Sequence, residues 1–590
     1  MRPNKWCRGV ARLFVAAAAA AAAATTAAPP CAPSSVPNSN TSAAPCAAGA
    51  PGAVCAYACD AGFLAVGEHV CQTYSTQAGV PLIAHAYFGG RCLPLCAASA
   101  APCAAGLVPV RVNASAAAAA AAAGSGSSAW CLSTTCLAPT EAITRLARGN
   151  YALWRRAFFA PTGMTSEHFD VTQPASGQPT LSHLGTSAIA LVLDCAAVAL
   201  NFTARSDAQV RANTTLSAFA GELASFAIPR QAQHGWLPTF FSRADGSSND
   251  GVFTVFDTGS NAAAALFARE WWTGTSAAGD ASPAARALTA NIARLAKKVF
   301  NLVDFTSFPV NASGWPAPDG TFIPASFAAD GSAPHVYPPL ADGMYAFNEL
   351  HYTVNLMYGQ ACPDAPTPSD CAAAGPAKFW QLWQERRLHP QLSYAGFPLL
   401  TDWPSYVTQL PFYLTASFSA DPVYSALFRA SWEADRAYFE SAAYFSAAPR
   451  YGLAAGATDP ACAMTGGGYE ADRLAPTSVG EGLQGCRMHS PYAVAGYLPA
   501  APTEITADLL ALLAEGVTVL SVPDLSDGDV VMVRRSLLEP DWRGDTYVTS
   551  IDFVSELFGL SALLLGTDFY TSNGAHNFSS LTPAAPEWAP

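Results

Sequence analysis

The stretch that decides the fold class runs from residue 282 to residue 303 and reads SPAARALTANIARLAKKVFNLV. Ser282 and Pro283 are residue types that favour the N-cap and the first turn of a helix. The apolar residues that follow recur at steps of four, three, four and four, which places them on one face of a helix. The stretch is therefore predicted to form an amphipathic helix. Its apolar face consists of Leu288, Ile292, Leu295, Val299 and Val303.

Comparable patterns continue through most of the chain after residue 139. Helices are predicted to begin at Pro422 and to end before Gly516 and Gly566, because proline favours the first helical turn and glycine the position after the last. The helical patterns do not alternate with strands, which argues against a parallel α/β fold. About ten to twelve helices fit a closed ring of helical hairpins, with functional groups in long loops at one end. Further helices are predicted over residues 140–158, 186–201, 214–226, 258–272 and 551–565, and after Thr503.

Composition excludes two classes of protein. The 590 residues include 30 Lys and Arg against 43 Asp and Glu, which gives a formal net charge of −13. This acidic excess opposes a surface that binds polyanions, so nucleic acid is not an expected partner. The 13 tryptophans and 31 phenylalanines are too many for a disordered chain.

The N-terminus has the pattern of a secretory signal over residues 1–27. Basic residues at Lys5, Arg8 and Arg12 precede an apolar run over residues 14–24. This run is shorter than the roughly 20 residues that a membrane span needs, so no stable membrane insertion is expected after signal removal. The protein is predicted to be secreted or extracellular, and a place in the cell-surface matrix stays open. Six glycosylation sequons are compatible with this, at Asn40, Asn113, Asn201, Asn213, Asn311 and Asn577.

Most of the 16 cysteines lie close to the N-terminus. Ten fall between Cys31 and Cys136, enough for five disulfides of open pairing. Residues 28–105 are therefore predicted to form a small disulfide-rich module, weakly similar to a sushi domain, that is held by disulfides rather than by a core. Residues 106–138 are predicted to be an Ala/Gly/Ser linker with the last cysteines of this group. The other cysteine predictions are two local pairs, Cys362 with Cys371 and Cys462 with Cys486, and a free buried thiol at Cys195.

The usual motifs of several enzyme classes are missing from the sequence. It contains no GxSxG or HExxH motif. The cysteines form no CxxC pair and the histidines lack ligand spacing, which argues against zinc. No metal or cofactor is expected.

Two loop clusters combine carboxylates with aromatic rings, as a carbohydrate-active site does. The first runs from His234 and Trp236 to Asp257, an aspartate that either caps the following helix or points into a cleft. The second places Glu349 close to Tyr345. Desolvation by such surroundings can raise the pKa of a glutamate and make it a general acid, whereas the alternative is a paired or solvated residue at a helix margin.

Two further clusters contain aromatic rings beside aspartates. Trp403 follows an aspartate and is either a platform for a sugar ring or a packing residue. The other cluster runs from Tyr451 to Asp459 and on to a triple glycine. The triple glycine is not a phosphate loop, because the lysine and Ser/Thr of that motif are missing.

In their order along the chain, these and neighbouring segments resemble the glucoamylase-like (glycoamylase-like) family, which includes bacterial endo-β-1,2-glucanases. The resemblance implies an all-α fold, an (α/α)6 barrel over residues 139–590. It also implies inverting hydrolysis of a β-glucan by carboxylates. The segments that carry it are residues 186–193, 212–216, 234–241, 256–259, 347–349, 451–455, 489–499 and 550–561.

The resemblance also implies site residues. Asp257 and Glu349 match acidic positions of the family's cleft, and Asp459 is a looser match. An acidic position of the family is occupied here by Val252, unless Asp250 replaces it. Glu349 is expected to act as the acid, and Asp257 to orient a water or a sugar hydroxyl. The residues expected to contact the sugar are His234, Trp236, Tyr345, Asn348, Trp403 and Tyr451.

The leading hypothesis is a secreted glycoside hydrolase that acts on a β-glucan, for which β-1,2 linkage is one option, or on a related polysaccharide. The alternative is a non-catalytic carbohydrate-binding glycoprotein of the cell surface or matrix, which the loss of an acid at Val252 would favour. A third reading is a structural wall protein with an all-α body, since a fold does not fix a function.

Overall fold

The structure is a computed structural model of the 590-residue chain. The residues it describes are 32–36, 38–42, 44–50, 53–60, 63–66, 69–75, 83–88, 91–94, 103–114, 131–171, 173, 175–248, 251–274, 282–307, 310–311, 321–329, 335–337, 351–362, 388, 390, 392–441, 449–458, 469–472, 474, 488–516, 519–520, 529–537 and 548–574.

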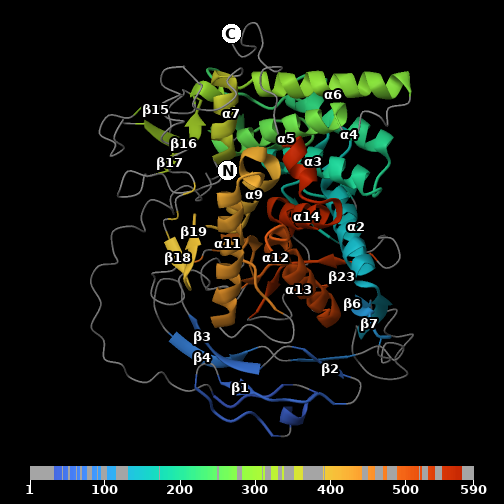
Figure 1. Cartoon of the computed structure of the whole chain (residues 1–590), viewed down its shortest axis with the longest axis vertical. Coiled ribbons are helices and arrows are strands. Elements are labelled where there is room, and N and C mark those ends of the chain that lie inside the picture. The colour runs from blue at the N-terminus through green and yellow to red at the C-terminus, as the bar shows by residue number, and fades with distance from the viewer. Residues whose placement is uncertain are drawn as a thin grey trace.

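The helical body is an (α/α)6 barrel, as the sequence predicts (Figure 1). Among the described residues, six helices form an inner ring in which each contacts the next along the chain. The last of them, α14, contacts the first, α3, so the ring is closed. Nearly all of their side chains are buried. The inner helices are α3 Leu184–Ala199, α5 Val255–Thr273, α7 His351–Ala361, α9 Tyr406–Leu414, α12 Pro491–Gly496 and α14 Ser550–Leu565.

The outer helices alternate with the inner ones along the chain and bury only one face. In α6 the side chains of Ile292, Leu295 and Val299 are buried, as their spacing predicts. Ser282 caps this helix, because its hydroxyl accepts a hydrogen bond from the N–H of Ala285 at 3.0 Å. The outer helices in the described ranges are α2 Pro139–Ala157, α4 Arg205–Phe219, α6 Pro283–Asn301, α11 Pro422–Ser441 and α13 Pro502–Glu515, and two short helices complete the body, α10 Ala416–Ser419 and α15 Asp568–Asn573.

Most predicted helix positions are confirmed, but the bounds predicted for α4 are wrong. The sequence pattern places a helix over residues 214–226, whereas α4 begins at Arg205 and ends at Phe219. Its buried face includes Ala208 and Ala212, whose small side chains give a weak apolar pattern. The helix ends before Gly221, whose φ of +69° suits glycine.

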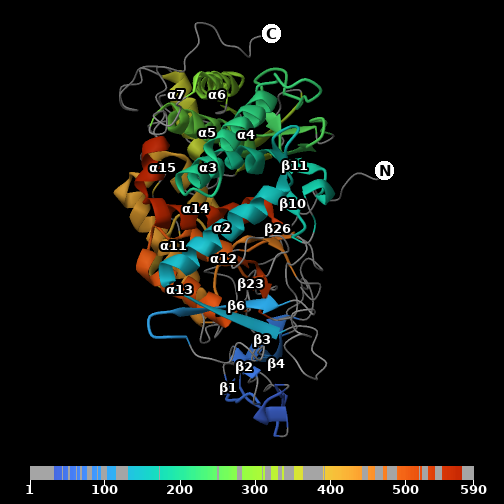
Figure 2. The same ribbon diagram turned by 90° about the vertical axis from the view of Figure 1, so that its right-hand side faces the viewer.

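Short antiparallel strands lead directly into four of the inner helices. β11 precedes α3, β14 precedes α5, β22 precedes α12 and β26 precedes α14. Figure 2 shows β10, β11 and β26 together on one side of the barrel. The inner helices thus begin at the end of the barrel that carries these strands, which is its strand end. The pairs at this end are β10 His168–Phe169 with β26 Val548–Thr549, β11 Leu181–His183 with β13 Phe240–Ser242, β12 Leu237–Pro238 with β14 Val252–Thr254, β20 Ala455–Ala457 with β21 Tyr469–Ala471, and β22 Met488–His489 with β25 Arg535–Ser536.

The other strands of the helical body form small sheets in its loops. β16 pairs with β14 as well as with β15 and β17, so a five-stranded sheet extends from the start of α5. These strands are β8 Phe158–Phe159, β9 Met164–Thr165, β15 Val310–Asn311, β16 Thr321–Ala328, β17 His335–Tyr337, β18 Leu392–Tyr394, β19 Phe397–Leu399, β23 Val519–Leu520 and β24 Val531–Met532.

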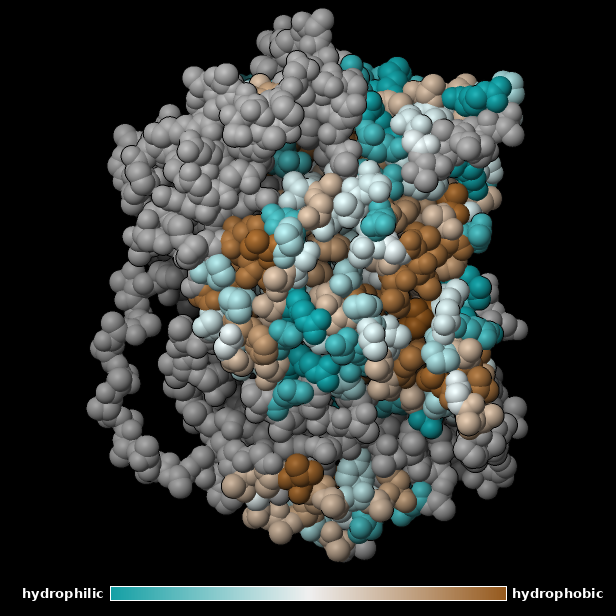
Figure 3. Space-filling model, viewed as in Figure 1, coloured by the Kyte–Doolittle hydropathy of each residue, from teal (hydrophilic) through white to brown (hydrophobic). Residues whose placement is uncertain are grey.

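Ion pairs connect α11 to α13 on the outside of the barrel. Arg436 lies 3.0 Å from Asp508, and Arg429 lies 3.7 Å from Glu504. Figure 3 shows hydrophilic residues gathered on this face between the two helices. These pairs place charged side chains of α11 and α13 on the outer surface of the barrel.

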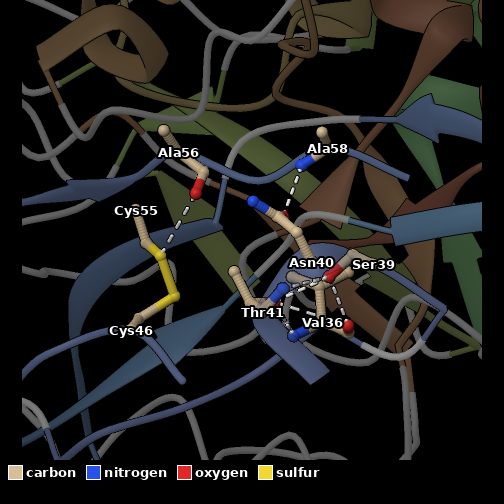
Figure 4. Close-up of a disulfide and its surroundings, with 8 residues drawn as sticks. All are labelled: Val36, Ser39, Asn40, Thr41, Cys46, Cys55, Ala56 and Ala58. Atoms are coloured by element: carbon tan, nitrogen blue, oxygen red, sulfur yellow. Dashed lines mark hydrogen bonds between the residues drawn. A yellow bond between two sulfur atoms is a disulfide. The ribbon is translucent and has the colours of Figure 1, made fainter. Parts of the chain in front are cut away.

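The N-terminal module consists of strands and lies at one end of the molecule, next to the helical body (Figure 1). The disulfide between Cys46 and Cys55 joins two of its segments (Figure 4). Beside it, the hydroxyl of Ser39 donates to the carbonyl of Val36 at 2.6 Å, and the N–H of Ala58 donates to Asn40 at 2.7 Å. The prediction that disulfides hold this module is supported. Its strands are β1 Val54–Cys55, β2 Phe63–Val66, β3 His69–Ser75, β4 Ile83–Phe88 and β5 Arg91–Pro94, and η3 Asn40–Ser42 is a 3₁₀ turn.

Part of the predicted linker is folded, which corrects that prediction. β6 Val108–Ala114 pairs with β7 Cys131–Leu137, and the disulfide between Cys103 and Cys136 closes the hairpin. The side chain of Val110 is buried in the main core, and β6 contacts α13 and α2. The valines at alternate positions of β6 give it the period of a strand, which the alanine-rich composition of the region obscures.

The remaining cysteine predictions have different outcomes. Cys195 is free and buried, as predicted. Cys362 is disulfide-bonded, whereas Cys371, Cys462 and Cys486 lie outside the described residues. The proposed signal, residues 1–27, also lies outside them. No helix within the described ranges is long and apolar enough to cross a membrane.

Candidate active site

Several predicted site residues cannot be placed. Glu349, Tyr345, Asn348 and Asp459 all lie outside the described residues. In the chain, Glu349 stands two positions before α7, which begins at His351 and belongs to the inner ring.

Two predicted sugar-stacking rings are buried in the core, which corrects their assignment. Trp236 is 0% exposed and stacks on Phe327 with 5.4 Å between ring centroids. Tyr451 is also 0% exposed. Its hydroxyl accepts a hydrogen bond from the indole of Trp432 at 2.9 Å and donates to Asp508 at 3.0 Å. Neither ring has a face left for a sugar.

His234 and Trp403 lie nearer the surface. The His234 Nδ1 atom is 3.2 Å from Asp304 Oδ2, and its side chain is 30% exposed. Trp403 is partly buried against the core, and its N–H donates to the hydroxyl of Thr401 at 3.2 Å. Both keep some exposed surface, so contact with a sugar remains a prediction.

Asp257 lies in the first turn of α5 and does not cap that helix. Its side chain is 2% exposed, and its Oδ2 atom accepts a hydrogen bond from the Thr254 hydroxyl at 2.8 Å. The Thr239 hydroxyl donates in turn to the Thr254 hydroxyl at 3.0 Å. The other oxygen, Oδ1, lies 3.3 Å from Nε2 of His183. Asp257 is thus fixed by neighbouring side chains at the strand end of the barrel, and its place in a cleft stays a prediction.

Glu167 belongs to the same neighbourhood. Its N–H donates to the carbonyl of Leu181 and its carbonyl accepts from the N–H of Ser550, both at 2.9 Å. The side chain is 5% exposed, and its Oε2 atom has no hydrogen-bond partner. Burial, and then the charges of Asp552 and Asp257, raise the pKa of Glu167 well above its ordinary value. Burial thus favours the uncharged form of Glu167, whose carboxyl group interacts with two others.

Asp552 lies in the first turn of α14 and is also buried. Its Oδ1 atom accepts a hydrogen bond from the N–H of Ala455 at 3.2 Å, whereas Oδ2 has no partner. Burial raises the pKa of Asp552 well above its ordinary value, and the charge of Asp472 acts in the same direction. The positive charge of Arg534 opposes this shift.

Asp472 differs from these carboxyl groups because it is paired with a cation. Arg534 donates to Asp472 at 3.0 Å and to the hydroxyl of Ser490 at 3.1 Å. The N–H of Ala454 also donates to Asp472, at 3.3 Å. This buried pair fixes the loops that approach Asp552.

The three carboxyl groups have unequal surroundings. Asp257 accepts a hydrogen bond from a hydroxyl, whereas burial raises the pKa of Glu167 and of Asp552. Carboxyl groups in different surroundings can take the separate roles of acid and base in one reaction. In the part of the chain that the structure describes, no group of three or more His, Cys, Asp or Glu has the arrangement of a metal site.

Sequence reasoning did not single out Glu167, His183 or Asp552 as site residues. Asp552 carries a signal that could have found it, because it stands between Ile551 and Phe553 at the start of an apolar helix. Glu167 carries no such signal. It reaches the site because β10, which follows it, pairs with β26 from the other end of the domain.

No protein-family model matches the sequence, and no curated protein is similar to it in sequence. A candidate glucoamylase from Bacteroides fragilis is similar in structure, with a TM-score of 0.53 and 14% identity over 77% of this chain and 96% of its own. A β-1,2-glucanase from Parabacteroides distasonis has a TM-score of 0.52 and 12% identity over 78% of this chain and 62% of its own. An endo-β-1,2-glucanase from Chitinophaga pinensis, in complex with sophorotriose and glucose, has a TM-score of 0.50 and 12% identity over 77% and 96%. The chain has the fold of glucoamylase-like proteins and endo-β-1,2-glucanases, as its sequence motifs predict.

Proposed function

We propose that this protein is a secreted glycoside hydrolase that acts on a β-linked glucan by an inverting, two-carboxylate mechanism. The observation that carries the proposal is the buried group of Asp257, Glu167 and Asp552, in unequal surroundings, where the inner helices begin. Two proteins of the same fold are β-1,2-glucanases, which supports a β-1,2-linked glucan as the first substrate to try.

In this mechanism Asp257 acts as the base. It accepts a proton from the water that attacks the anomeric carbon, while an acid protonates the leaving glycosidic oxygen. Two residues compete for the role of acid. Glu349 is favoured by its match to the family motif. Asp552 is favoured because burial raises the pKa of its carboxyl group and its Oδ2 atom has no hydrogen-bond partner.

The experiment is hydrolysis of β-1,2-, β-1,3- and β-1,4-glucans by the full chain and by the variants Glu349→Gln and Asp552→Asn. The variant that removes the acid should lower kcat by about 10²- to 10⁴-fold. Substrates with an activated leaving group should recover much of that loss, because they need no protonation. Proton NMR of the first product identifies the anomer. A product that retains the configuration of the substrate would overturn the inverting mechanism. If the chain hydrolyses none of the glucans, the proposed enzymatic activity is overturned.

A non-catalytic sugar-binding protein is the second candidate, because Val252 occupies a position at which the family often carries an acid. Val252 lies on β14, three positions before α5 begins, and pairs with Ala328. Binding of a glucan without turnover, unchanged in Asp257→Asn, would favour this function over hydrolysis.

The secreted location is part of the proposal. The disulfides Cys46–Cys55 and Cys103–Cys136 support it, because such bonds persist in oxidising compartments. Expression of the full chain in a secreting host, followed by N-terminal sequencing of the protein in the medium, tests it. Retention of the intact N-terminus inside the cell would contradict it.

A further inference from the structure

We propose that His183 is a positioning residue for Asp257: it caps α3 through Nδ1 and donates the proton on Nε2 to the Asp257 carboxylate. This proposal rests on the proposed function in so far as Asp257 takes part in a reaction. The position of the proton on the His183 ring is independent of that function and can be measured without any substrate.

The cap fixes where the proton of His183 sits. His183 is the N-cap residue of α3, and its Nδ1 atom accepts a hydrogen bond from the N–H of Thr186 at 3.2 Å. A ring nitrogen that accepts a hydrogen bond carries no proton. The neutral ring must therefore hold its proton on Nε2.

Nε2 lies beside an Asp257 oxygen that has no donor. Nε2 of His183 is 3.3 Å from Oδ1 of Asp257, and this oxygen has no hydrogen-bond partner in the structure. Oδ2 of the same carboxylate already accepts a hydrogen bond from Thr254. The proposed bond from His183 therefore needs a small closer approach of the ring, as catalytic hydrogen bonds often do when substrate binds. It would leave Asp257 held at both of its oxygens.

The orientation of the His183 ring is fixed by packing. The ring is 7% exposed and meets the ring of Phe240 edge-on, with 5.3 Å between centroids and 71° between planes. His183 and Phe240 are opposite each other in the β11–β13 pair. The strand pairing and the helix cap therefore set the same ring orientation independently.

Gly185 allows the side chains of His183 and Asp257 to lie close together. A Cβ atom at this position would lie 2.9 Å from Oδ1 of Asp257 and 3.1 Å from Cε1 of His183. Carbon atoms rarely approach an oxygen or a ring so closely, so any larger residue would push the pair apart. Glycine is needed here for space, next to both members of the pair.

The charges around His183 favour a neutral ring. The titratable groups that act on it from the described elements are Asp257 on α5 and His168 on β10. Glu167, which precedes β10, interacts with Asp257, and burial raises the pKa of Glu167. Burial lowers the pKa of His183, and the Asp257 charge opposes this shift only in part. A neutral ring with its proton on Nε2 is the state that agrees with all of these contacts.

The variant His183→Asn separates positioning from capping. Asparagine is among the best N-cap residues, so the start of α3 should be preserved. Its amide is too short to cap the helix and to reach Asp257 as well. Thr254→Val is the matched variant for the other oxygen of Asp257, and it leaves the cap untouched.

The first measurement is the tautomer of His183 in the full chain labelled with ¹⁵N-histidine. The resonances that disappear in His183→Asn belong to this ring, and they should show a proton on Nε2 and none on Nδ1 between pH 6 and 8. A proton on Nδ1, or a ring charged throughout this range, would overturn the proposal whatever the activity of the protein.

The second measurement is kinetic and applies once a hydrolysed glucan is known. His183→Asn should lower kcat by about 10- to 100-fold with little change in KM, as is typical for groups that orient a reacting group. A variant with unchanged kcat would refute the positioning role. If the parent chain hydrolyses no glucan, the proposed function fails while the tautomer measurement still decides the state of His183.

Discussion

A buried aspartate lies near each end of helix α3, and the two aspartates differ in their hydrogen-bond partners. In its second half, Asp194 accepts hydrogen bonds from Arg211 at 2.8 and 2.9 Å and from the hydroxyl of Tyr151 at 2.7 Å. At its start, Asp257 from the neighbouring α5 accepts a hydrogen bond from the Thr254 hydroxyl and has Nε2 of His183 at 3.3 Å from its other oxygen. It has no ion pair with Lys or Arg among the described residues.

On the proposed function, the difference distinguishes a carboxylate that stabilises the fold from one that takes part in the reaction. A buried carboxylate is normally neutralised by a cation, as at Asp194, because leaving it unpaired is costly. The strand end of the barrel, in contrast, leaves oxygens of Asp257, Glu167 and Asp552 without a partner. Groups with unused hydrogen-bonding capacity can bind or transfer protons to a substrate, whereas a fully paired group cannot.

The largest effect is expected from Asp257→Asn. If Asp257 is the base, this variant should lower kcat on the hydrolysed glucan by about 10³-fold or more, which steady-state kinetics measures. Its melting temperature should stay close to that of the parent, because the change removes an incompletely paired buried charge. Asp207→Asn, at an exposed position of α4, is the matched control and should behave as the parent. Full activity in Asp257→Asn would show that Asp257 is not the base and would remove its contrast with Asp194.

Asp194→Ala should have the reverse profile. It leaves the guanidinium of Arg211 buried without its carboxylate, and removing one partner of a buried pair costs about 3–5 kcal/mol. Chemical denaturation monitored by far-UV circular dichroism would measure this loss in the free energy of unfolding. At temperatures where the variant is folded, its KM should match that of the parent. A stable Asp194→Ala protein with impaired catalysis would reverse the roles assigned to the two ends of α3.

The fold could be predicted from the sequence because its signals are local. The Ser282 cap and the positive-φ glycines Gly516 and Gly566 mark helix ends in the structure as they do in the sequence. Prediction failed where the signal was compositional, as for the bounds of α4 and for β6, because alanine fills buried and exposed positions alike.

The site was less predictable. Asp257 was found because it stands where a loop enters a helix. Trp236 and Tyr451 were misassigned, because nothing in an aromatic loop sequence tells whether the loop turns toward the core or toward solvent. Glu167 and His183 join Asp257 only through strand pairs and helix caps, and such long-range contacts leave no local pattern.

A smaller effect is expected from Glu556→Gln. This variant tests whether a buried carboxyl group on α14 makes the free energy of unfolding depend on pH. Burial raises the pKa of Glu556 to about 8 from an ordinary value of 4.5, although the Asn150 amide opposes the shift. Between these pH values the folded chain keeps a proton that the unfolded chain has released. The free energy of unfolding should therefore fall as pH rises, by at most about 1.4 kcal/mol per pH unit. Denaturation at pH 5, 6, 7 and 8 should show that the free energy of unfolding depends less on pH in Glu556→Gln than in the parent. The same dependence in both proteins would refute the raised pKa of Glu556.

The smallest effect is expected at Glu222, which is paired like Asp194 but lies at the surface. Arg294 and Lys298 on α6 donate to it at 2.6 and 2.9 Å, and the hydrogen bond from Arg294 is the main reason that the pKa of Glu222 is lowered to about 2. Exposed pairs are screened by water and salt, so Glu222→Gln should cost less than about 1 kcal/mol, and less still in high salt. The same denaturation assay as for Asp194→Ala measures it. A loss as large as that of Asp194→Ala would show that pairing, rather than burial, determines the cost of removing a carboxylate, and the contrast between the ends of α3 would then need another cause.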